Sequence, residues 1–160
     1  MTAFKFLVID DQSAEFVCAL RYAGLRAKAI RGAVVVLSII HTSRFSHWVA
    51  ISEDLRAQAL EEARAAAERH LALLREECGA AAELVLAESD TRAAIRSVLE
   101  NEPAIRAVVL ATSAGRGGPG PLISSLARQA PMANRPVAVV VIPGDLSPEG
   151  VAELAAPGGL

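Results

Sequence analysis

A glycine-rich loop between an apolar run and a helical pattern is the part of this sequence best suited to hold a ligand. The run 105–111 predicts a buried strand, and Gly115, Gly117, Gly118 and Gly120 follow it closely. Glycine lets backbone N–H groups approach a bound anion, and the N-terminus of the next helix adds unpaired donors and partial positive charge. We therefore expect this loop to hold a phosphate group.

Side chains near this loop could complete a phosphate site. Ser124 and Ser125 lie in the helical pattern that follows the loop, where they would face the phosphates. Arg116 could neutralise a phosphate, although an exposed loop arginine is usually only solvated. The alternative is a plain connection whose glycines satisfy turn geometry. Pro119 and Pro121 remove two N–H donors from the loop and stiffen it.

Two adjacent carboxylates end the first apolar run of the chain. Asp10 and Asp11 stand at the carboxyl end of this predicted strand. A carboxylate there could accept hydrogen bonds from a ribose or from an adenine amine. The same side chains could instead cap the helix that follows. Beside a bound phosphate they could also hold Mg²⁺, which prefers carboxylate, phosphate and water oxygens.

The sequence contains no arrangement of residues typical of an enzyme. The G-x-S-x-G elbow and the G-x-x-x-x-G-K-[ST] loop are both missing. His41 and His47 would need a third ligand to hold a metal, and none is evident. Cys18 and Cys78 have no cysteine or histidine two to four residues away, so we expect buried, reduced thiols. The sequence thus predicts no catalytic residue and no metal centre.

The amino-acid composition limits the class of protein and the kinds of partner that this chain can have. The chain has 160 residues, of which 52% are hydrophobic and 21% are charged, which suits one globular domain. A formal net charge of −2 argues against a duplex nucleic acid partner, which needs a clustered positive surface. No secretory signal and no bilayer-spanning apolar run is recognisable. We expect a cytoplasmic protein without a membrane or nucleic acid partner.

The elements that would position these residues alternate along the chain. Apolar runs of strand length cover 4–10, 33–40, 82–87, 105–111 and 136–142. Helical patterns cover 13–32, 52–78, 89–102, 121–130 and, more loosely held, 147–156. Ser13 should cap the first helix, and Gly32 should end it. In the longest helix we expect a buried stripe formed by Leu60, Ala63, Ala67, Leu71, Leu74 and Cys78. His70 lies beside this stripe and is expected to pack or to face solvent.

This alternation predicts an α/β fold built on a single open, doubly wound parallel sheet. Right-handed crossovers and wholly apolar strands place helices on both faces. Ligands in such sheets bind beyond the carboxyl ends of the strands, where the winding direction reverses. If the first and fourth strands are neighbours, Asp11 and the glycine loop face one crevice.

Several segments resemble the universal stress protein family. Residues 6–13 are similar to its first strand, which ends in Asp-x-Ser, and residues 34–41 resemble its second strand. The fourth strand, the glycine loop and residues 136–143 resemble its C-terminal third, so the likeness covers residues 3–145. It implies a five-stranded parallel sheet of order 3-2-1-4-5 and a dimer. It also implies that Asp11 faces an adenosine and that Ile40 lies near the adenine ring.

The nucleotide-binding branch of that family carries G-x-x-G, nine residues, and then G-[ST]. An ungapped match places Thr112 and Gly115 on the first pair, and Ser125 and Leu126 on the second. A slip of one residue would place Ser124 and Ser125 on that second pair. Two of the three glycines are therefore replaced, which counts against ATP binding and leaves the fold assignment unchanged.

The resemblance implies a cytoplasmic regulatory or sensor module that binds ATP or AMP, with Mg²⁺, at the carboxyl ends of strands 1 and 4. The expected binding residues are Asp11, Ile40, Gly115, Gly117, Gly118, Ser124 and Ser125. A dimeric protein-interaction module without a nucleotide is the alternative, followed by a slow nucleotide hydrolase. The fifth strand should form a homodimer, because its apolar edge would promote aggregation if left bare. We expect one domain over 1–146 and a tail over 147–160.

Overall fold

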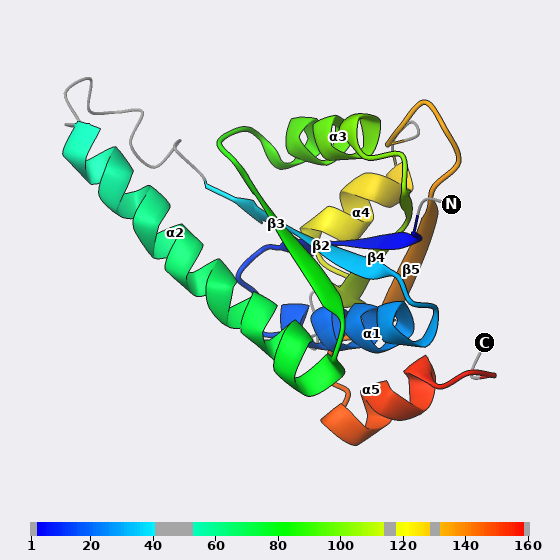
Figure 1. The fold of residues 1–160 in the computed structure, drawn as a ribbon. Helices are drawn as coiled ribbons and strands as arrows, with labels where there is room; N and C mark the ends of the chain where they lie inside the picture. The colour runs from blue at the N-terminus through cyan, green and yellow to red at the C-terminus, as the bar shows by residue number, and fades with distance from the viewer. Residues whose placement is uncertain (1–2, 41–52, 114–117, 129–131, 159–160) are drawn as a thin grey trace.

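Strands and helices alternate along the chain in the computed structural model, which describes residues 3–40, 53–113, 118–128 and 132–158 (Figure 1). The strands are β1 (Lys5–Asp10), β2 (Ala33–Ile39), β3 (Ala81–Ala87), β4 (Ile105–Thr112) and β5 (Ala138–Pro143). The helices are α1 (Phe16–Ala29), α2 (Glu53–Leu73), α3 (Thr91–Asn101), α4 (Pro121–Arg128) and α5 (Pro148–Ala155). A π-helical turn, Leu74–Cys78, extends α2.

The strands form one parallel sheet of order β3-β2-β1-β4-β5. This confirms the predicted fold class and strand order. The winding direction reverses at β1, because β2 lies on one side of it and β4 on the other. The carboxyl ends of β1 and β4 are therefore adjacent, as a ligand site in such a sheet requires.

Each face of the sheet has its own hydrophobic core. Alternate residues of β1 point to opposite faces, so Phe6 and Val8 join one core while Leu7 and Ile9 join the other. The first core is completed by α1, α5 and the C-terminal part of α2. The second is completed by α3 and α4. Figure 1 shows α1 and α5 below the sheet and α3 and α4 above it.

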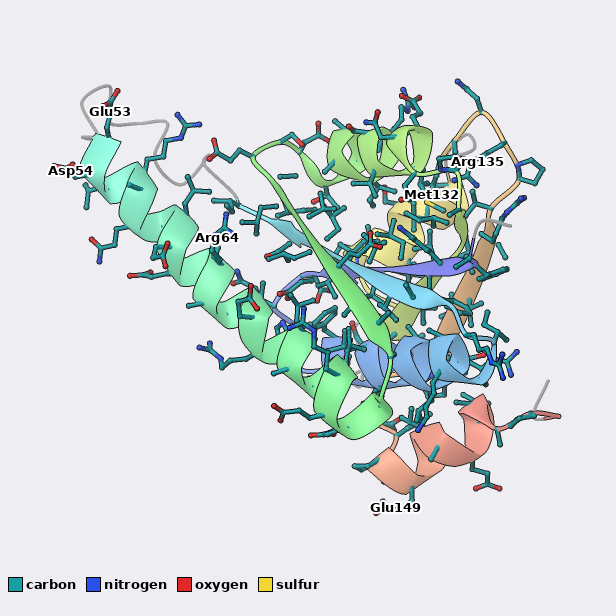
Figure 2. All side chains as sticks on the ribbon, in the orientation of Figure 1. Glu53, Asp54, Arg64, Met132, Arg135 and Glu149 are labelled. Carbon is teal, nitrogen blue, oxygen red and sulfur yellow. The ribbon has the colours of Figure 1, made fainter. Side chains whose placement is uncertain are left out.

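The buried stripe of α2 is shorter than its sequence pattern predicts. Ala67, Leu71 and Leu74 are buried, but Leu60 is only half-buried and Leu55 is 51% exposed. The N-terminal half of α2 extends beyond the sheet (Figure 1), and Figure 2 labels three charged residues along it, Glu53, Asp54 and Arg64. A stripe needs an opposing surface to be buried, and the sheet ends before this part of the helix.

Both predicted ends of the first helix are wrong in detail. The N-cap is Glu15, not Ser13. Ser13 instead lies in a tight turn before the helix, where its backbone N–H donates to Asp11 Oδ1. At the other end Arg31, not Gly32, takes the left-handed conformation, with φ 54°. Gly32 is needed for a different reason. A Cβ there would lie 2.2 Å from the carbonyl oxygen of Phe4.

The end of the helical segment predicted over 52–78, the start of the one predicted over 89–102 and the two buried cysteines agree closely with the structure. Gly79 ends the long helical segment at φ 65°, and Asp90 caps α3 through the backbone N–H groups of Arg92 and Ala93. Both cysteines are buried free thiols, and burial raises the pKa of Cys78. The fifth strand starts at Ala138, two residues later than predicted.

The last helix is more firmly packed than its sequence suggests. Ser147 caps α5 by accepting a hydrogen bond from the backbone N–H of Gly150. Val151 and Ala155 are buried in the core that α1 shares. Within the described part of the chain, no helix has the length and apolar character that crossing a membrane requires.

Candidate functional site

A cavity of about 300 Å³ lies at the carboxyl ends of β1 and β4. Its lining comes from the ends of both strands, the start of α1 and the start of α4. The lining residues are Ile9, Asp11, Ser13, Glu15, Phe16, Ala19, Val109, Leu110, Ala111, Ser113, Pro119, Gly120, Pro121, Leu122 and Ile123. The size is at the lower end of the range for small-molecule sites. The predicted crevice between the two strand ends is therefore present.

The walls of this cavity divide by polarity. Ile9, Phe16 and Val109 are buried apolar side chains that can contact a flat ring. Asp11 and Ser113 are exposed polar residues on the rim. Ser13 and Glu15 add further polar groups at the start of α1, so the lining combines apolar and polar surface, as sites that orient a small ligand do.

Asp11 and Asp10 face different environments although they are adjacent. Asp11 lines the cavity, and its Oδ1 accepts a hydrogen bond of 3.0 Å from the backbone N–H of Ser13. Asp10 is only 5% exposed and does not line the cavity. Its Oδ1 accepts a hydrogen bond of 3.0 Å from the backbone N–H of Gln12. Its Oδ2 lies 3.2 Å from Nδ1 of His70.

This separation changes the interpretation of the two carboxylates. The expected pair of oxygen ligands for Mg²⁺ is not assembled in the cavity, because Asp10 turns to the α2 side of the sheet. Among the described residues no group of three histidine, cysteine, aspartate or glutamate side chains could hold a metal. Any Mg²⁺ here would rely on Asp11 together with phosphate and water oxygens.

Of the two loop glycines that the structure describes, Gly120 lines the cavity and Gly118 does not. Gly120 has φ 101°, a conformation that favours glycine, and a Cβ there would lie 3.1 Å from Ser113 Oγ. Gly118 has φ 89° and is exposed, with no atom within 4 Å of a Cβ position. Gly115, Gly117 and Arg116 lie outside the described residues.

The first turn of α4 borders the cavity and contains backbone N–H groups without a partner inside the helix. The helix starts at Pro121, and the N–H of Ser124 already donates to the carbonyl of Gly120. The N–H groups of Leu122 and Ile123, both cavity residues, precede the first intrahelical bond. Ser124 itself and Ser125 are half-buried in α4 and are not lining residues. The lining at the start of α4 thus comes from Leu122 and Ile123, not from the two predicted serines.

The remaining predicted positions lie elsewhere. Ile40 follows β2, donates its backbone N–H to Ala87, and is not a lining residue. His41, His47 and Trp48 fall outside the described residues. Sequence reasoning missed two contributors, Ser113 in the cavity and His70 beside Asp10. The position of His70 next to a buried helical stripe was the only signal for it.

Comparison with known proteins supports this architecture. Residues 4–143 match the universal stress protein family. A family member from Burkholderia pseudomallei has 20% identity over 89% of this chain and 97% of its own, with a TM-score of 0.63. No curated protein sequence matches the chain.

Two further similar structures hold nucleotides. The universal stress protein from Archaeoglobus fulgidus in complex with dAMP has 18% identity over 88% of this chain and 99% of its own, with a TM-score of 0.59. A universal stress protein in complex with cAMP has 15% identity over 91% and 100%, with a TM-score of 0.57. These likenesses show a shared fold, and the match over residues 4–143 shows that the chain belongs to the universal stress protein family.

Proposed function

We propose that this protein binds an adenine nucleotide in the cavity between β1 and β4 and acts as a cytoplasmic regulatory module. The observation that carries this proposal is the composition of the cavity wall. Its apolar part, which includes Ile9, Phe16 and Val109, can contact a purine ring, and Asp11 on the rim can accept hydrogen bonds from a ribose or an amine.

The phosphate end of the ligand would lie at the start of α4. The N–H groups of Leu122 and Ile123 are first-turn donors, and the helix N-terminus carries partial positive charge. Ser113 Oγ lies close to Gly120 at the same side of the cavity. Only two backbone N–H groups follow Pro121, which has none, before the first hydrogen bond of the helix. Two donors suit a single phosphate group better than a chain of several.

The comparisons support the choice of ligand. One similar structure is a complex with dAMP and another is a complex with cAMP, each with one phosphate group. We therefore place AMP and its cyclic or deoxy forms ahead of ATP for this chain. Thr112 and Ser125 replace two glycines of the G-x-x-G, nine residues, G-[ST] motif. This also favours AMP over ATP, because a longer phosphate chain would depend most on those glycines.

Thermal unfolding with and without nucleotide tests this proposal. At a concentration 100 times its dissociation constant, a ligand stabilises the folded state by about 2.7 kcal/mol. We expect AMP, dAMP or cAMP to raise the melting temperature. Asp11→Asn should weaken binding about tenfold, the effect of losing one hydrogen bond to a charged acceptor. Calorimetric titration gives the dissociation constants.

Asp54→Asn is the matched control, since it removes the same charge from the exposed first turn of α2. It should bind as the unmodified protein does. The proposal fails if no adenine nucleotide at millimolar concentration changes the melting temperature. Unchanged affinity in Asp11→Asn would show that the ligand does not contact this carboxylate.

A dimeric protein-interaction module is the second candidate, and the surface of β5 favours it. Val139 is 45% exposed and Val141 is 43% exposed, on an edge strand whose partner on the inner side is β4. An exposed apolar edge strand is a template on which another chain can pair. We infer that β5 pairs with a second copy about a two-fold axis, with or without a nucleotide in the cavity.

A further inference from the structure

Asp10 and His70 join β1 to α2 directly behind the cavity. Asp10 is the last residue of β1, and His70 lies in α2, on the same side of the sheet. Asp10 Oδ2 and His70 Nδ1 are 3.2 Å apart, and the side chain of Asp10 is 4% exposed while that of His70 is 25% exposed. Asp10 is the only buried charged side chain in the described part of the chain. A buried carboxylate needs partners, and this one has two.

The first partner of Asp10 is the loop that carries Asp11. Asp10 Oδ1 accepts the backbone N–H of Gln12, whose φ of 61° is unusual for a residue other than glycine. The following N–H, that of Ser13, donates to Asp11 Oδ1. The Asp10 carboxylate therefore holds the loop in the conformation that places Asp11 on the cavity rim.

The second partner, His70, reaches the cavity by another route. The rings of His70 and Phe16 meet edge to face, with centroids 4.9 Å apart and an interplanar angle of 69°. Phe16 is buried and lines the cavity. His70 thus supports one cavity wall through Phe16 and, through Asp10, the loop that forms the rim.

The contact between Asp10 and His70 has the distance of an ion pair but not the direction of a hydrogen bond. Nδ1 is buried and has no hydrogen-bond partner, so attraction to Asp10 depends on charge. A neutral imidazole leaves the buried carboxylate with the Gln12 N–H alone, whereas an imidazolium supplies an opposite charge. Histidine is the side chain that changes charge between pH 5 and 8.

Among the other charged groups on the elements packed here, Glu15 precedes Phe16 in the chain and lines the cavity, and others pair with each other. β2 has no charged residue, and Glu83 of β3 binds Lys5 near the opposite end of the sheet. Arg21 of α1 binds Glu77 of the π-helical turn. On α2 itself, the neighbours one turn away from His70 are Ala66, Ala67, Leu73 and Leu74. Asp10 is thus a charged side chain that His70 contacts directly.

We propose that Asp10 and His70 are positioning residues of the cavity, and that the charge on His70 controls how firmly its rim and wall are held. This inference rests on the proposed function for its ligand, but the coupling itself exists without one. Protonated His70 holds α2, Phe16 and Asp10 together. Loss of the proton loosens the loop from Asp10 to Ser13 and the Phe16 wall, which lowers nucleotide affinity.

The test follows the ligand-free protein and the complex as pH rises from 6 to 8. Amide resonances of Asp11, Gln12, Ser13 and Phe16 should shift in parallel with the His70 ring signals. The dissociation constant for cAMP, whose phosphodiester keeps one charge throughout this range, should rise about fivefold, a typical coupling between two sites. In His70→Gln, the amide shifts should disappear and the affinity should be nearly independent of pH.

Two controls keep the outcomes separate. A His41→Gln/His47→Gln variant removes the other two histidines of the chain and should retain the pH response. Asp10→Asn keeps an oxygen for the Gln12 N–H and should lose the response. If Asp10→Asn does not fold, the result for His70→Gln alone decides whether the inference stands.

Loop and Phe16 shifts that persist in His70→Gln would overturn the inference, whatever binds. Loss of those shifts together with failure of the unmodified protein to bind any nucleotide would support the coupling and reject the proposed ligand. Nucleotide binding with the same pH dependence in His70→Gln would support the proposed function and reject the role of His70.

Discussion

The carbonyl oxygen of Thr112 lies 2.0 Å from the position that a Cβ on Gly144 would occupy. Cβ and Cγ of Glu15 lie 2.6 and 2.4 Å from the same position. Gly144 therefore lets the chain after β5 pass between the end of β4 and the start of α1. Both of these segments also contribute to the cavity, so a side chain at Gly144 would displace its walls.

We expect Gly144→Ala to destabilise the protein by about 1–3 kcal/mol, the usual cost of overpacking a close contact. Urea unfolding monitored by circular dichroism measures the change. Gly150→Ala is the control, because its Cβ would meet its neighbours at 3.4 Å or more and would lie in a helix. It should be neutral or stabilising. A neutral Gly144→Ala would show that β4 and α1 move apart at little cost.

Arg135 (labelled in Figure 2) donates hydrogen bonds to three backbone carbonyls between the end of α3 and the start of β4. Its Nη1 donates to Ile105 at 2.6 Å, and its Nη2 donates to Leu99 and Glu102 at 3.0 Å each. Arg135→Met leaves these carbonyls without their donor. We expect a loss of about 1–3 kcal/mol in the free energy of unfolding.

Arg92→Met provides the comparison for Arg135, since Arg92 is exposed on α3. It should change the stability by no more than about 0.5 kcal/mol. Arg135→Lys should recover only part of the loss, because a lysine ammonium lacks the planar fork of a guanidinium. Equal stability of Arg135→Met and the unmodified protein, in the same urea titration, would refute this role.

Lys5 links β3 to the end of α3 through two glutamates. Its Nζ lies 2.7 Å from Glu83 and 2.8 Å from Glu102. The hydrogen bond with Glu102, followed by that with Glu83, raises the pKa of Lys5, and the same bond from Lys5 lowers the pKa of Glu102. Because the folded-state pKa of Glu102 is lowered, this stabilisation is fully present above the ordinary glutamate pKa of about 4.3.

Lys5→Met should therefore cost about 1 kcal/mol at pH 7, a modest value because the carboxylates remain partly in water. As pH falls through the lowered pKa of Glu102, the difference between variant and unmodified protein should shrink. Melting temperatures from pH 7 to pH 3 provide the measurement. Lys28→Met, an exposed change on α1, should show no such trend. A difference in melting temperature between Lys5→Met and the unmodified protein that stays constant down to pH 3 would contradict the ion pair.

The exposed valines of β5 provide a test of the proposed dimer. A Val139→Glu/Val141→Glu variant puts two like charges on the edge strand, and we expect it to be monomeric. Both positions are about half exposed in the single chain, so the fold should tolerate the change. Light scattering coupled to size-exclusion chromatography gives the mass of each species.

Leu55→Glu alters another exposed apolar residue, on the projecting part of α2, and should leave the dimer intact. A monomeric unmodified protein at high micromolar concentration would reject pairing through β5. So would a dimer that survives both charges, because it would have to use another surface.

Most of the architecture could be predicted from local patterns. Strands covered on both faces are continuous apolar runs, and the five runs of this chain each became a strand within about two residues of the predicted ends. The helix ends were less predictable. Ser13 is a favourable cap by type, but residues 11–13 form an Asx turn and the helix starts only at Phe16. Such local side-chain-to-backbone bonds offer the backbone an alternative to the helix that residue preferences do not reveal.

The amino-acid sequence by itself determined the alternating elements, the apolar strands and the family, because each depends on residues close together in the chain. Only the tertiary structure decided what Asp10 and Asp11 do. Neighbouring residues at the end of a strand turn to opposite sides of the sheet, so one carboxylate meets His70 and the other meets the cavity. That choice depends on which helices cover each face, and helices distant in sequence are placed only by packing.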